Sequence, residues 1–79
     1  MLHYIICDST VILTKKKYSS WREIQAEYNT YVTSLGPFLL NELLEYFADE
    51  YKDETEWPFS KNEIHIFWND TSECLKKHF

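Results

Sequence analysis

The feature that most constrains the fold is a stretch near the start of the chain, residues 2–7, that is apolar on both faces. Read as a strand, it places Leu2, Tyr4 and Ile6 on one face and His3, Ile5 and Cys7 on the other. Two largely apolar faces are typical of a strand inside a sheet that is covered on both sides. At 79 residues the chain is long enough for one domain, expected over residues 1–79.

A second strand is predicted over residues 10–14, where the sequence Thr-Val-Ile-Leu-Thr is rich in β-branched side chains. Asp8 and Ser9 form a turn signal between the two strands, so we expect them to pair as a hairpin. Three lysines, 15–17, follow the second strand and would protect an exposed sheet edge.

The middle of the chain predicts two helices joined as a helical hairpin. Ser20 and Glu23 have the spacing of a capping box, and apolar residues then recur at intervals of three and four as far as Leu35. Gly36, the only glycine, would end this helix, and Pro37 would begin the next. The second helix is expected from about residue 38 to residue 51 or 52.

The last third predicts a polar loop over residues 53–60, a strand over 62–68 and a short helix over 72–78. The strand would place Ile64, Ile66 and Trp68 on one side and His65 and Phe67 on the other, and the helix rests on the capping-box spacing of Asp70 and Glu73. The predicted class is therefore α+β: about three strands, a hairpin plus a third strand, packed with a helical hairpin and a short C-terminal helix.

Charge is concentrated in residues 42–56, which we call the acidic segment. It holds seven acids and one lysine, Lys52, so its net charge is −6. The rest of the chain carries +1, which gives the whole chain its net charge of −5. The acids are Glu42, Glu45, Asp49, Glu50, Asp53, Glu54 and Glu56. On a helix, Glu42, Glu45, Asp49 and Asp53 would share one face, with Glu50 and Glu54 in an adjacent row if the helix continues that far.

Two interpretations of this segment remain open. A surface helix needs a polar side, so the acids can simply be a solvated face. Alternatively, the near absence of lysine beside them indicates that a partner supplies the positive charge. Tyr46, Tyr51 and Trp57 lie in or beside the segment, and aromatic side chains rimmed by charge resemble a protein–protein interface, although a domain this small also needs large side chains in its core.

The leading hypothesis is a non-enzymatic inhibitor that uses the acidic helix and the aromatic loop after it to block a basic site on a nucleic-acid-handling protein. Carboxylates along such a helix are about 6 Å apart, a distance similar to that between successive phosphates of a nucleic acid. Inhibitors made by phages and plasmids against host defence, and immunity proteins that neutralise nucleases, share this general character. The alternative is a small adaptor or subunit that binds through an aromatic surface, and salt distinguishes the two because an acidic decoy loses affinity steeply as salt rises.

Enzymatic and metal-binding functions have weaker support. Cys74 and His78 are four residues apart, and Cys7 and His65 would pair a thiol with an imidazole if their strands are neighbours, but we expect no metal, cofactor or catalytic site. Lys15 and its two lysine neighbours give too weak a phosphate footprint for direct nucleic-acid binding, and the net charge opposes it.

The compartment follows from what the sequence lacks. The apolar run at the start ends at Asp8 and carries no basic region before it, and no apolar run approaches the roughly 18 residues that span a bilayer. We therefore expect a cytoplasmic protein without membrane contact, in which Cys7 and Cys74 are free thiols. The oligomeric state is not indicated.

Overall fold

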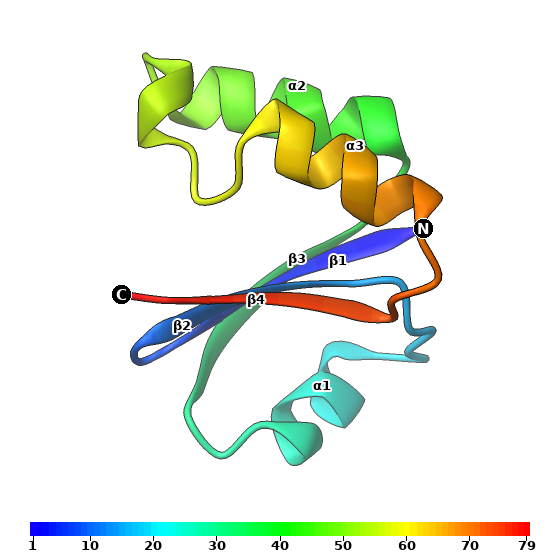
Figure 1. Cartoon of the computed structure of the whole chain (residues 1–79). Helices are drawn as coiled ribbons and strands as arrows, with labels where there is room; N and C mark the ends of the chain where they lie inside the picture. The colour runs from blue at the N-terminus through cyan, green and yellow to red at the C-terminus, as the bar shows by residue number, and fades with distance from the viewer.

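The computed structural model describes all 79 residues and shows a four-stranded antiparallel sheet with helices on both of its faces (Figure 1). The α+β class is confirmed, with four strands rather than three. The elements are β1 (Leu2–Cys7), β2 (Thr10–Thr14), α1 (Trp21–Glu27), β3 (Tyr31–Phe38), α2 (Leu40–Glu50), the 3₁₀ helix η1 (Glu54–Glu56), α3 (Lys61–Asn69) and β4 (Cys74–His78). The strand order is β3-β1-β2-β4.

The predicted strands 2–7 and 10–14 are confirmed, and they pair as the antiparallel hairpin at the centre of the sheet. Successive side chains of β1 point to opposite faces of the sheet and contribute to two separate cores. Leu2 and Tyr4 join a cluster under α2 and α3, and Ile5 and Cys7 join a smaller cluster under α1. Both cysteines are free thiols, Cys7 buried and Cys74 half-buried.

The two cores explain the connections between strands. The chain leaves β2, crosses one face of the sheet through α1 and returns as β3 beside β1. It then crosses the opposite face through α2 and α3 and returns as β4 beside β2. Figure 1 shows α1 on one side of the sheet and α2 with α3 on the other. None of these helices combines the length and apolar character needed to cross a membrane.

The predicted helical hairpin is wrong. The first helix ends at Glu27, and residues 31–38, expected to include its end and Gly36, form the edge strand β3. Gly36 is not a helix cap or hinge: it lies within β3 with a φ of +122°. A Cβ at Gly36 would lie 2.7 Å from the Leu2 carbonyl oxygen, so glycine allows β3 to approach β1 closely. Pro37 follows it in β3 and starts no helix.

The last third of the chain is also corrected: the strand expected over 62–68 is the helix α3, and the helix expected over 72–78 is the strand β4. A capping box begins α3, because the Ser60 hydroxyl accepts from the Glu63 amide at 3.1 Å and the Glu63 carboxylate accepts from the Ser60 amide at 3.0 Å. Asp70 instead accepts from the Ser72 amide in the turn before β4.

Glu63 also connects α3 to β4. Besides capping α3, its carboxylate accepts a hydrogen bond from the Lys77 ammonium at 2.8 Å. β4 pairs with β2 along its whole length, from Thr14 opposite Cys74 to Thr10 opposite His78. The edge strand is therefore held by its ladder on one side and by this ion pair above the sheet.

Replacing Gly36 by alanine tests the close approach of β3 to β1. The new Cβ would lie 2.7 Å from the Leu2 carbonyl oxygen. The alanine would also have to adopt the positive φ of Gly36. We expect Gly36→Ala to lower the free energy of unfolding by about 1–3 kcal/mol. Urea unfolding followed by circular dichroism measures the change. The matched control, Thr33→Ala on the exposed side of the same strand, should change it by less than about 0.5 kcal/mol, and equal effects of the two substitutions would contradict the explanation.

Replacing Glu63 by glutamine tests the link between α3 and β4 through pH. The hydrogen bond from Lys77, and after it that from the Ser60 backbone, lowers the pKa of Glu63 from its usual 4.5. A carboxylate whose pKa is lowered on folding stabilises the protein above its unfolded pKa, and this stabilisation is lost as the pH falls through the folded pKa. We expect Glu63→Gln to lower the free energy of unfolding by about 1 kcal/mol at neutral pH.

The difference between Glu63→Gln and the unsubstituted protein should shrink when unfolding is measured well below pH 4.5. Glu73→Gln is the control, because the exposed Glu73 side chain has no hydrogen bond or ion pair within the chain, and its replacement should leave stability nearly unchanged at both pH values. A Glu63→Gln deficit of the same size in acid and at neutral pH would refute the role of its ionised carboxylate.

Candidate functional site

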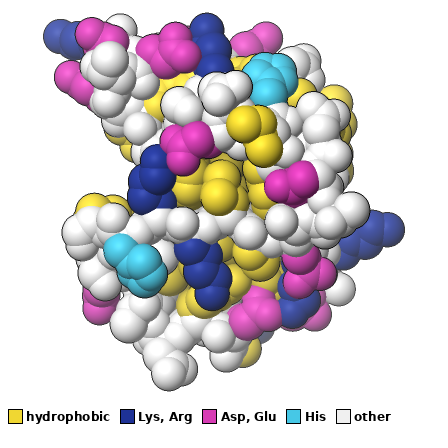
Figure 2. Space-filling view, in the orientation of Figure 1, with side chains coloured by type: hydrophobic (Ala, Val, Ile, Leu, Met, Phe, Trp, Pro, Cys, Tyr) yellow, Lys and Arg dark blue, Asp and Glu magenta, His cyan; other side chains and the backbone are white.

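The acidic segment lies on the outer side of α2 and continues through η1. Its seven acids are all exposed, and the buried side of α2 is formed by Leu43 and Phe47. The helix ends at Glu50, so Glu42, Glu45 and Asp49 follow the helix surface, whereas Asp53 and the second row expected with Glu54 do not continue it. Figure 2 shows acidic side chains gathered over η1 and the end of α2, at the upper left.

Three of the seven acids have partners within the chain. Glu42 accepts from the Leu39 amide at 2.7 Å, Asp53 accepts from the Thr55 amide at 3.1 Å, and Glu54 lies 3.7 Å from the Lys61 ammonium. The other four make no hydrogen bond or ion pair, and we call them the unpaired carboxylates: Glu45, Asp49, Glu50 and Glu56. Lys52, the only cation in the segment, forms no ion pair either.

Like charges at i and i+4, such as Glu45 and Asp49, destabilise a helix by about 0.2–0.5 kcal/mol per pair. No cation of the chain offsets this repulsion. The unpaired carboxylates are therefore a place where binding of positive charge from outside would relieve a cost that the folded protein carries alone.

The aromatic residues of the segment contact the core as well as solvent. Tyr46, Tyr51 and Trp57 are each half-buried and each packs on the fully buried ring of Phe47, with ring centroids 5.9, 6.0 and 5.6 Å away. Burial, and after it the Glu50 carboxylate, raises the pKa of Tyr46. Only part of each ring is open to a partner, so these residues hold the acidic segment on the sheet in addition to any contact they make.

A cleft of about 360 Å³ opens beside the acidic segment, between the helical layer and the sheet. Tyr4, Ile6 and Val11 of the central hairpin form its floor, and Tyr51 and Pro58 form one wall. The other rim consists of the end of β4 and the residue after it: Lys77, His78 and Phe79. Figure 2 shows a notch at the left with hydrophobic side chains in its depth.

The polar groups of the cleft are engaged. Burial, and after it the neighbouring Tyr51 hydroxyl, raises the pKa of Tyr4, which keeps the phenol protonated. Lys77 is paired with Glu63 at 2.8 Å, and the His78 Nδ1 lies 3.0 Å from the Thr10 hydroxyl. The cleft is therefore an apolar hollow without free charge of its own.

Sequence reasoning missed this cleft. It depends on β4 lying beside β2, and residues 72–78 were expected to form a helix. The acidic segment, by contrast, was identified directly, with Tyr51 shared between the two. No local signal in residues 75–79 indicates that they would form the rim of a hollow.

The metal and thiol candidates are not brought together. Cys7 packs beneath α1, whereas His65 is exposed on α3, on the opposite side of the sheet, so they do not lie on neighbouring strands. The Cys74 thiol lies 3.4 Å from the Thr14 hydroxyl and His78 contacts Thr10. No group of three or more His, Cys, Asp or Glu side chains is arranged to hold a metal ion.

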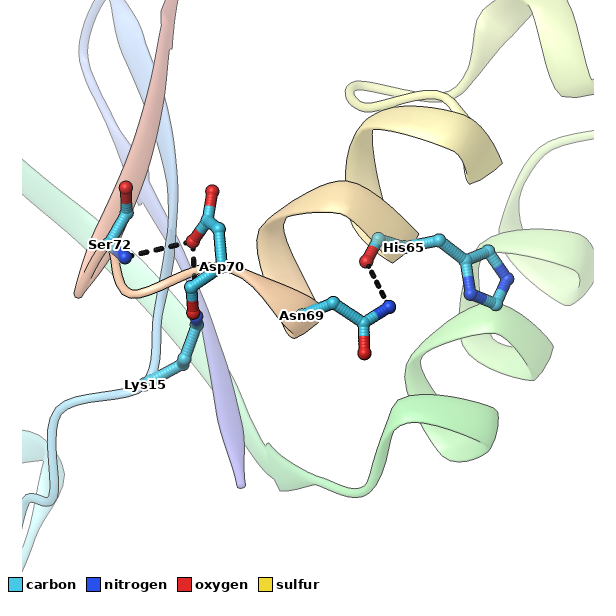
Figure 3. A network of polar contacts seen from close by, with 5 residues as sticks. All are labelled: Lys15, His65, Asn69, Asp70 and Ser72. Carbon is cyan, nitrogen blue, oxygen red and sulfur yellow. Dashed lines mark hydrogen bonds and ion pairs between the residues drawn. The ribbon is translucent and has the colours of Figure 1, made fainter.

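The lysine run is largely neutralised by the chain itself. Lys15 reaches the end of α3, where its ammonium donates to the Asp70 carbonyl oxygen at 2.9 Å and lies 3.4 Å from the Asp70 carboxylate (Figure 3). Lys16 pairs with Glu27, which has a lowered pKa because of that bond and a second one from Tyr18. Figure 3 also shows the His65 ring pointing away from Lys15 and Asp70. Only one lysine of the run, Lys17, remains unpaired.

The comparisons with known proteins add no relative. No protein-family model matches the sequence, and no curated protein or solved structure matches the chain. The acidic segment and the cleft beside it are therefore the features on which a function for this chain rests.

Proposed function

We propose that this protein is a non-enzymatic binding protein whose acidic segment occupies a basic site on a nucleic-acid-handling protein and blocks it stoichiometrically. The observation that supports this most is the set of unpaired carboxylates, Glu45, Asp49, Glu50 and Glu56, which are gathered in residues 45–56 with a single cation, Lys52, that pairs with none of them. A basic nucleic-acid groove would supply the cations that these groups lack within the fold.

The spacing of the carboxylates supports the same partner. Glu42, Glu45 and Asp49 lie along α2 at intervals of three and four residues, with neighbouring side chains about 5–6 Å apart. A site that binds successive phosphates holds its cations at comparable intervals. Inhibition would follow from occupancy alone, because the proposal requires no chemical step.

A small adaptor or subunit of a larger assembly is the second candidate, and the cleft favours it. An apolar hollow of about 360 Å³ beside half-buried aromatic rings suits attachment through apolar contact. Affinity for a partner held mainly by apolar contact would change little with salt, whereas affinity through the unpaired carboxylates would fall as salt screens them.

Charge reversal at Glu45 and Asp49 tests the proposal. The immobilised protein, the double variant E45K/D49K and the control D8K/E73K are each exposed to a cell extract, and the retained proteins are identified by mass spectrometry. The control changes the net charge by the same amount at exposed acids outside the acidic segment. Circular dichroism and thermal unfolding establish that all three proteins fold.

We expect the unsubstituted protein and D8K/E73K to retain nucleic-acid-binding proteins that duplex DNA displaces and that elute as salt rises from about 50 to 200 mM. The double variant E45K/D49K should retain at least about tenfold less of them, because two attractive charges become repulsive. Equal retention by a folded E45K/D49K would refute the role of the acidic segment.

A further inference from the structure

The cleft and the acidic segment are parts of one surface. Tyr51 and Pro58, which form one wall of the cleft, are connected through the loop that carries η1. Glu50 immediately precedes Tyr51, and Glu56 lies two residues before Pro58. Two of the four unpaired carboxylates therefore belong to the segment that forms this wall.

The charge around the cleft is negative on balance. Across from that wall, the Lys77 ammonium is 2.8 Å from the Glu63 carboxylate, so the rim presents an ion pair rather than a free cation. Glu50 and Glu56 have no such partner, and the one free cation of residues 50–58, Lys52, faces an excess of acids there: Glu50, Asp53, Glu54 and Glu56. An anionic ligand would meet uncompensated carboxylates here, whereas a cationic one would neutralise them.

The interior of the cleft suits one large apolar side chain. Its floor consists of Tyr4, Ile6 and Val11, of which Tyr4 and Val11 are buried in the larger core, so the floor is fixed by the sheet. Its volume, about 360 Å³, is near the lower end of ligand pockets, which span about 300–1,000 Å³. Side chains that anchor protein interfaces fill hollows of this kind, with charged groups around them.

We propose that the cleft receives an aromatic or large aliphatic side chain from a basic segment of the partner protein, with lysine or arginine on either side of it contacting Glu50 and Glu56. This inference rests on the proposed function and specifies its partner: the basic site includes an exposed apolar residue flanked by cations. The apolar residue gives the complex its register, and the cations give it its salt dependence.

Three short synthetic peptides test the inference without knowledge of the partner. The first carries a tryptophan flanked by lysines and arginines, the second replaces the tryptophan by serine, and the third keeps the tryptophan but replaces the basic residues by glutamates. Binding is measured by fluorescence anisotropy at about 50 mM salt. We expect the first peptide to bind at least about tenfold more tightly than the second, and the third not to bind.

Variants of the protein test where the first peptide binds. The neutral double variant E50Q/E56Q should weaken its binding severalfold, whereas E23Q/E73Q, a matched removal of two exposed glutamate charges away from the cleft, should not. Phe79→Ala, at a rim residue that is 74% exposed and therefore dispensable for folding, should also weaken it. Amide chemical shifts on binding should change at Val11, Tyr51 and Lys77 and not at Lys17.

Each possible failure has a distinct meaning. Equal affinity of the tryptophan and serine peptides, with salt dependence retained, would overturn the inference about the cleft and leave the proposed function standing. Tryptophan-dependent binding that neither salt nor E50Q/E56Q weakens would overturn the inference that cations flank the apolar side chain, whereas the proposed function is refuted only by the E45K/D49K result. A dimer in analytical ultracentrifugation that Phe79→Ala dissociates would show that a second copy of the chain fills the cleft, which would also overturn the inference.

Discussion

The fold depends on the burial of β1 on both of its faces. Leu2 and Tyr4 face α2 and α3, and Ile5 faces α1, so one strand contributes to both cores at once. Each of these side chains is at most 2% exposed. A strand with this pattern needs a neighbour on either side and a layer above and below it. β2, β3 and the three α-helices supply these, and β4 follows because β2 needs a partner on its other edge.

The parts of the fold predicted correctly are those in which the local sequence favours the same secondary structure that the tertiary packing requires. β1 and β2 are short continuous runs of apolar and β-branched residues, and α2 has apolar residues at helical spacing. Residues 28–35 were misjudged because apolar residues at intervals of three and four also occur in a strand with aromatic and β-branched side chains. The run Thr30 to Thr33 has the β-branched and aromatic composition that favours β3. Helical spacing there was coincidental, since α1 ends at Glu27.

The reversal of α3 and β4 has a different cause. Ile64, Ile66 and Trp68 would share one face of a strand over 62–68, which favoured a strand, but Ser60 and Glu63 have the capping-box spacing that begins α3. That signal was available and was missed. The same spacing at Ser20 begins a helix without a side-chain cap, and at Asp70 it begins no helix. A capping motif therefore indicates a helix only where apolar residues on one helix face, here Ile64 and Phe67, meet a core.

The candidate site was predictable to the extent that it depends on exposed charge. Acids without neighbouring lysines remain exposed in nearly any fold, so the acidic segment could be identified from the sequence. Its shape could not, because the end of α2 at Glu50 turns the remaining acids away from the helix row. The cleft could not be predicted from the sequence, because its floor and its rim come from segments more than 60 residues apart that meet only through the β2–β4 ladder.

The placement of α1 opposite α2 has a consequence for the approach to a partner. Lys17 precedes α1, and Arg22 lies in it without an ion pair, whereas the unpaired carboxylates lie on α2 and η1 across the sheet. The molecule therefore carries an electric dipole through the thickness of the sheet. In the field of a basic surface it would rotate before contact and arrive with the acidic end forward, so a larger fraction of encounters would be productive.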